Sequence, residues 1–169
     1  MTDFCQCSAE AGSATCAYPI LPREAIVCPT NGKVGKLVDT QIVKSMLDLP
    51  LRELHSGQYY FCKESDCPTV YYNADGQRFT ESNLRERVYQ KNPADDTVKV
   101  CYCFQHTSAS IRDELISTRA TTVITSITDG IQRELCACDI RNPQGSCCLG
   151  NVNALLKRIK QELSTKNQT

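Results

Sequence analysis

The chain has 169 residues, which is enough for one ordinary domain or two small ones. Its 19 Lys and Arg residues balance 19 Asp and Glu residues, so it lacks the basic surface typical of nucleic-acid-binding domains. The N-terminus has neither the basic nor the apolar segment of a secretory signal, and no run is long enough to span a membrane. We therefore expect a cytoplasmic protein.

The 12 cysteines are the most informative residues. Their density falls just below that of secreted disulfide scaffolds. In a reducing cytosol, so many thiols favour metal ligation over disulfides. The chain also lacks Trp, so each half would have a thin core that gains stability from a bound metal. We find no hydrolytic triad, phosphate-binding loop or dinucleotide fingerprint, and we expect no independent enzyme.

In chain order, residues 1–27 form an irregular arm that contains Cys5, Cys7 and Cys16. A small α+β unit is expected over residues 28–92. Within it, Asp39 is a candidate cap for a short helix that ends before Pro50.

Two strands are predicted in this unit, over residues 59–62 and 69–72. The turn residues 73–76 indicate a hairpin into a third strand, which ends near Phe79. The polar residues 91–98 contain a proline and are expected to be a linker.

The pattern becomes helical in the second unit, residues 98–163. Thr107 or Ser108 is a candidate cap for its first helix. Apolar residues at helical spacing predict a second helix running up to Cys136 and a third starting just after Cys148. We therefore expect an α+β protein in which a zinc-knuckle unit precedes a helical unit.

The cysteines of the second unit form two Cys-x-Cys pairs and one adjacent pair. In an extended segment residues i and i+2 point the same way, so each Cys-x-Cys pair can reach one iron of a [2Fe–2S] cluster. Adjacent cysteines tend to point apart, so at most one of Cys147 and Cys148 should reach a cluster. The helix that follows would direct its N–H groups toward the anionic cluster. The two Cys-x-Cys pairs alone could equally bind zinc.

These motifs resemble a known family. Val100-Cys-Tyr-Cys-Phe104, followed by Cys136-Ala-Cys-Asp-Ile-Arg-Asn-Pro-Gln-Gly-Ser-Cys-Cys-Leu-Gly150, closely resembles the N-terminal domain of the CopZ-type copper chaperones. Cys28-Pro-x-x-Gly32-x-x-Gly-Lys36 and Tyr59-Tyr-Phe-Cys62-x4-Cys67-x-x-Val-Tyr-Tyr72 agree with it, so the resemblance covers roughly residues 26–152. The family joins a zinc site to a [2Fe–2S] site whose fold is like bacterioferritin-associated ferredoxin.

The resemblance implies zinc ligation by Cys28, Cys62 and Cys67. Structural zinc takes four ligands, and many relatives have a further cysteine where this chain has Asn31. A cysteine of the arm (Cys16, Cys7 or Cys5) is the expected fourth ligand, with His55 a weaker candidate.

The resemblance also implies a ligand set for the [2Fe–2S] cluster. The expected ligands are Cys101, Cys103, Cys138 and Cys148, with Cys136 and Cys147 as the less favoured choices. His106 is a candidate neighbour of the cluster that tunes its potential.

The function implied is a redox-active accessory in copper or other metal handling. Full-length chaperones of the family add a Met-x-Cys-x-x-Cys copper domain that these 169 residues do not contain. Binding of Cu⁺ by the spare thiols is a hypothesis. The alternatives are an electron-transfer module that docks on a partner redox protein, or a redox or metal sensor. Expected partners are metal ions and a protein redox or metal-transfer partner, without nucleic acid or membrane insertion. Formation of a homodimer is left open.

Overall fold

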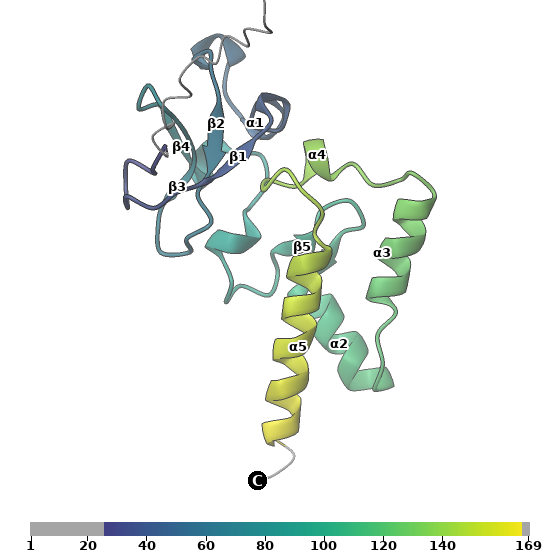
Figure 1. Cartoon of the computed structure of the whole chain (residues 1–169). Helices are drawn as coiled ribbons and strands as arrows, with labels where there is room; N and C mark the ends of the chain where they lie inside the picture. The colour runs from purple at the N-terminus through teal and green to yellow at the C-terminus, as the bar shows by residue number, and fades with distance from the viewer. Residues whose placement is uncertain (1–25, 167–169) are drawn as a thin grey trace, which may run out of the picture.

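The computed structural model describes residues 26–166 and shows a sheet-containing part followed by a mostly helical part (Figure 1). The first part is built on an antiparallel sheet with the strand order β1-β2-β3-β4. Its strands are Lys36–Val38 (β1), Tyr59–Phe61 (β2), Thr69–Asn73 (β3) and Arg78–Thr80 (β4). The predicted strands and hairpin turn are confirmed, and β1 is an additional strand that pairs with β2.

Helix α1, Thr40–Met46, packs beside the sheet and buries Ile42, Val43 and Met46. The predicted cap is confirmed, because the Asp39 carboxylate accepts a hydrogen bond from the Gln41 N–H at 2.8 Å. Short 3₁₀ turns follow α1 and β4 and precede β5: Leu51–Glu53, Glu81–Asn83 and Tyr89–Lys91.

The second part opens with a two-stranded hairpin and continues with helices. Its elements are β5 (Lys99–Cys101), β6 (His106–Thr107), α2 (Ser108–Thr118), α3 (Val123–Gln132), α4 (Cys138–Arg141) and α5 (Leu149–Lys166). Thr107 caps α2, accepting from the Ser110 N–H at 3.1 Å. α5 begins directly after Cys148, as predicted. α3 ends at Gln132, short of Cys136, because Glu134 adopts a left-handed backbone with φ 57° that a helix cannot continue through.

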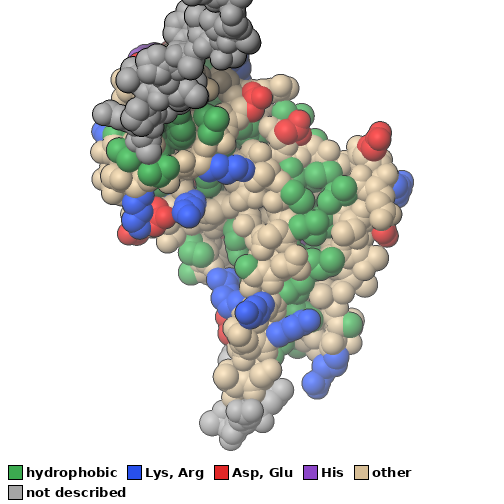
Figure 2. All heavy atoms as spheres, viewed as in Figure 1, with side chains coloured by type: hydrophobic (Ala, Val, Ile, Leu, Met, Phe, Trp, Pro, Cys, Tyr) green, Lys and Arg blue, Asp and Glu red, His purple; other side chains and the backbone are tan. Residues whose placement is uncertain are grey.

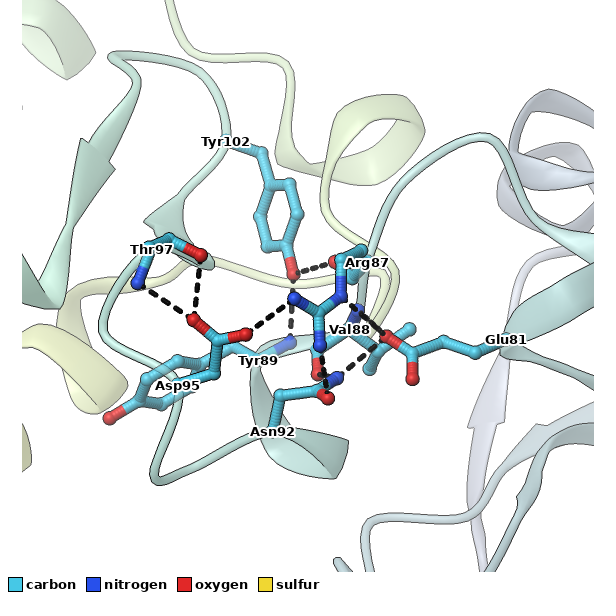
Figure 3. Close-up of polar contacts among 8 residues, drawn as sticks. All are labelled: Glu81, Arg87, Val88, Tyr89, Asn92, Asp95, Thr97 and Tyr102. Atoms are coloured by element: carbon cyan, nitrogen blue, oxygen red, sulfur yellow. Dashed lines mark hydrogen bonds and ion pairs between the residues drawn. The ribbon is translucent and has the colours of Figure 1, made fainter.

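The polar segment 91–98 is folded against its surroundings and does not behave as a free linker. Arg87 donates hydrogen bonds to Asp95 and to Asn92, each at 2.5 Å, and lies 3.9 Å from Glu81 (Figure 3). Hydrogen bonds from Thr97 and Arg87 lower the pKa of Asp95 to about 2. This network fixes the connection between the sheet and the β5–β6 hairpin.

The two parts have separate cores that meet at α1 and α4, which pack together. The α+β architecture expected from the sequence is therefore confirmed. None of the helices within residues 26–166 is long and apolar enough to cross a lipid bilayer.

Candidate metal centres

The first centre is a buried triad of thiols, Cys28, Cys62 and Cys67, whose sulfurs lie within 4.8 Å of one another. Cys28 precedes a turn closed by Gly32, and the other two flank the loop between β2 and β3. The Cys62 N–H donates to the Val70 carbonyl at 2.9 Å, which extends the pairing of the two strands to the ligand itself. The first centre is thus held by a turn and a hairpin, the usual supports of a zinc knuckle.

The donor set fits zinc. Two thiolates on one tetrahedral zinc ion lie about 3.8 Å apart, since each Zn–S bond is about 2.3 Å. The Cys28 and Cys67 sulfurs are separated by 3.8 Å. Burial alone would raise the pKa of Cys28, but N–H groups of Thr30 and Asn31 hydrogen-bond to its sulfur and lower the pKa overall. These donors favour the thiolate that a metal requires.

Asn31, which the resemblance placed at a ligand position of the family, contacts the centre through its side-chain amide. Its amide Nδ2 donates to the Cys62 sulfur at 3.5 Å. The arm cysteines expected to complete the centre, Cys5, Cys7 and Cys16, lie outside the described residues. His55 does not belong to the thiol triad, and its N–H is bonded to Gln77 at 2.9 Å.

The second centre gathers five thiols from three separate segments. Cys103, Cys136 and Cys138 form a triad with sulfur separations of 3.3, 3.6 and 4.0 Å. Cys101 and Cys148 pack with Cys138 in one buried cluster, against which Cys103 and Cys136 also lie. All four expected cluster ligands therefore lie together, and Cys136 is a fifth member.

The hydrogen bonds of the second centre favour thiolates at two positions. Bonding from the Cys148 thiol, opposed by burial, lowers the pKa of Cys101 to about 7. The same donor lowers the pKa of Cys138 to about 5. The pKa of Cys148 is raised because its thiol donates to both, and burial adds to this. That shared proton must leave when a metal cation binds.

Backbone N–H groups surround these sulfurs. The Ala137 N–H donates to Cys103 at 3.3 Å, and N–H groups of Phe104 and Cys148 donate to Cys101 and Cys138 respectively. Such N–H···S bonds stabilise metal-bound thiolates and tune the reduction potential of iron–sulfur centres. Thiolate sulfur is also the donor type that iron–sulfur clusters take, so the residues fit such a group.

One local expectation needs correction. β5 ends at Cys101, and residues 102–105 form a turn closed by Gln105 at φ 60°. Cys101 and Cys103 consequently have different neighbours and do not behave as an extended i, i+2 pair. Cys136 and Cys138 behave differently: although α4 begins at Cys138, their sulfurs lie 3.3 Å apart, so this pair can reach one site.

The adjacent cysteines differ strongly in their surroundings. Cys148 is buried with 1% exposure, whereas Cys147 is exposed. The geometry therefore favours Cys148 as the ligand, and the choice between Cys136 and Cys138 stays a prediction. His106 pairs with Cys101 across the β5–β6 hairpin, and its buried Nε2 has no hydrogen-bond partner among the described residues.

Sequence analysis missed the polar residues that anchor these centres. Tyr71 and Tyr102 are buried hydroxyl donors to backbone carbonyls. The only sequence signal was the position of Tyr102 inside a Cys-x-Cys pair.

Comparison with known proteins identifies the class to which the first centre belongs. Residues 25–85 match the CopZ family model described as a zinc-binding domain. The resemblance to a CopZ-type zinc-binding domain that the sequence predicted is therefore confirmed over this part of the chain.

The match extends further in the fold. The structure is similar to the X-ray structure of the Archaeoglobus fulgidus CopZ N-terminal domain, with a TM-score of 0.65 and 25% sequence identity. The match covers 77% of this chain and 97% of that one. A comparison with curated protein sequences gave no match.

Proposed function

We propose that this protein is a redox-active accessory in the handling of copper or another soft metal, with Zn²⁺ in the first centre and a [2Fe–2S] cluster in the second. The observation that carries the proposal is the second centre itself. Five thiols of the described residues pack together there from three segments, two of them are held toward the thiolate form, and N–H donors surround them. When bound, such a cluster supplies a one-electron couple.

The residues of this chain would divide the work as follows. Cys101, Cys103, Cys138 and Cys148 hold the cluster, and Cys28, Cys62 and Cys67 hold zinc. The first turn of α5, beginning at Leu149, presents N–H groups beside Cys148, which favours negative charge there. The protein has no turnover of its own in this proposal, and its thiols require a reducing compartment such as the cytoplasm.

A second candidate is an electron-transfer module that docks on a partner redox protein. Three large apolar residues around Cys136 are exposed: Ile131, Leu135 and Ile140. Figure 2 shows hydrophobic side chains gathered on the face between α3 and α5. An apolar surface near the cluster favours close approach of a partner to the redox centre.

Anaerobic purification with metal and sulfide analysis tests the proposal. We expect two irons, two sulfides and one zinc per chain, with the visible absorption of a [2Fe–2S] cluster. Four irons with four sulfides, or no acid-labile sulfide, would contradict it. Stoichiometric, thiol-dependent Cu⁺ binding would favour metal handling. Docking on a redox partner without affinity for Cu⁺ would favour the electron-transfer module.

A further inference from the structure

The loop over residues 139–147 joins Cys138 to Cys148, and its turn rests on the first part of the chain. The hydroxyl of Tyr71, in β3, donates a buried hydrogen bond to the Pro143 carbonyl at 2.6 Å. Burial raises the pKa of Tyr71, so the hydroxyl keeps its proton and remains a donor. The loop is therefore fixed from outside at the centre of its turn.

Neighbouring contacts hold the same loop at its ends. Ser45 Oγ donates to the Ile140 carbonyl at 2.8 Å, and Lys36 Nζ donates to the Gln144 carbonyl at 3.1 Å. Gly145 has φ +61°, and a Cβ there would lie 3.4 Å from Ile42 Cγ2 of α1. The loop backbone thus lies directly against the first part.

A second tyrosine anchors the other cysteine segment. Tyr102 stands between Cys101 and Cys103 and is 2% exposed. Its hydroxyl donates to the Arg87 carbonyl at 2.8 Å and accepts from the Tyr89 N–H at 3.0 Å (Figure 3). The side chain of Arg87 is itself held by Asp95 through an ion pair. The Cys-x-Cys turn is therefore tied to the connector that leaves β4.

We infer that Tyr71 and Tyr102 are positioning residues for the second centre, and that the zinc-binding part is the scaffold that sets its geometry. Each hydroxyl fixes one backbone segment that carries two of the thiols. Strand β3 links the two centres. Tyr72 packs with the cysteines of the first centre, while its neighbour Tyr71 holds the loop over residues 139–147. The inference rests on the proposal that the second centre binds a metal group, but not on that group being a [2Fe–2S] cluster.

Three single variants of the full chain test it: Tyr71→Phe, Tyr102→Phe and the control Tyr59→Phe. Tyr59 is also fully buried and lies in the same sheet, but its hydroxyl donates to the His55 carbonyl at 3.0 Å, within the first part. We measure the midpoint potential of the loaded centre, the rate at which a chelator bleaches it, and unfolding in urea. Partners that orient ligands typically contribute tenfold or more to metal retention. Tyr71→Phe and Tyr102→Phe should therefore lose the metal group about tenfold faster and shift its potential.

The control should match the wild type in potential and bleaching rate, even where its resistance to urea falls. Equal behaviour of all three variants would overturn the inference. If the wild type holds neither iron nor sulfide, the proposal of a [2Fe–2S] cluster fails. The first centre is then loaded with zinc, and Co²⁺ binding at the second centre is measured for the wild type and the variants. Weaker Co²⁺ binding confined to Tyr71→Phe and Tyr102→Phe would support the inference. Equal binding, or no binding by the wild type, would overturn it.

Discussion

At the level of single residues, Cys147 and Cys148 make the sharpest contrast in the molecule. Replacing Cys148 with Ser should bleach or strongly shift the cluster spectrum, because this buried thiol contacts two others and an alkoxide is a harder ligand than a thiolate. Cys147→Ser should leave the spectrum nearly intact, since its side chain is exposed. Visible absorption of the two purified variants, side by side, checks this. The reverse pattern would reassign the ligand.

His106 should make the protein sensitive to mild acid. Burial lowers the pKa of His106 below its ordinary value of 6.5, and Glu114 opposes this only in part. The unfolded chain then binds a proton more readily as the pH falls below about 6.5, so the folded state loses stability there. Above that pH the contribution is fully present.

When the pH is lowered from about 7.5 to about 5.5, the free energy of unfolding should therefore fall less in the His106→Gln variant than in the wild type. Urea unfolding at both pH values measures it, and replacement of the exposed His55 by Gln is the control. A variant as acid-sensitive as the wild type would exclude this role for His106.

At the level of elements, α3 depends on a glycine. A Cβ at Gly130 would lie 2.2 Å from the ring of Phe104, whose N–H bonds the Cys101 sulfur. Gly130→Ala should destabilise the protein by about 1–3 kcal/mol through overpacking, despite a gain in helix propensity. A Cβ at Gly150 in α5 would meet no atom of the described residues within 4 Å, so Gly150→Ala should be neutral or stabilise by up to about 1 kcal/mol. Thermal unfolding of the two variants measures the difference in stability. Equal shifts in their unfolding temperatures would show that the Phe104 ring can move aside.

The arm bears on the first centre. Because even Cys16 has ample reach at about 3.3 Å per residue, loop closure costs little compared with a fourth thiolate on zinc. Deleting residues 1–20 should speed zinc loss to a chelator. If zinc retention is unchanged, the arm does not supply the fourth ligand. Asn31, His55 or water would then complete the site beside the three thiolates.

Local patterns were sufficient to predict most of these elements. The Asp39 cap, the strands around the Cys62–Cys67 loop and the start of α5 follow from capping, alternation and turn chemistry, which act within a few residues. The turn at Cys103 and the early end of α3 depend on residues with φ near 60°, Gln105 and Glu134, and neither is a glycine that would have signalled it. The grouping of Cys148 with Cys101 depends on tertiary packing, and only the family resemblance predicted it.

At the scale of the whole molecule, the two centres should respond to each other. Replacing Cys67 with Ser removes a proposed zinc ligand from the loop between β2 and β3, and Tyr71 of β3 holds the loop over residues 139–147. Coupled sites influence each other reciprocally. We expect this variant to lose zinc and also to release the group at the second centre faster, measured by metal analysis over time. Zinc loss with an unchanged second centre would show that the sheet holds its shape without the ion.

The contacts between the parts also impose an order of assembly. Lys36 meets Gln144 across 108 positions of sequence, and Tyr71 meets Pro143 across 72. Contacts of such separation form late, after the chain has closed long loops. During synthesis at about 5–20 residues per second, the sheet emerges several seconds before the last cysteine leaves the ribosome. The nascent zinc-binding part can thus fold before the cysteines of the second centre have all emerged, and these cysteines then assemble against a surface that already exists.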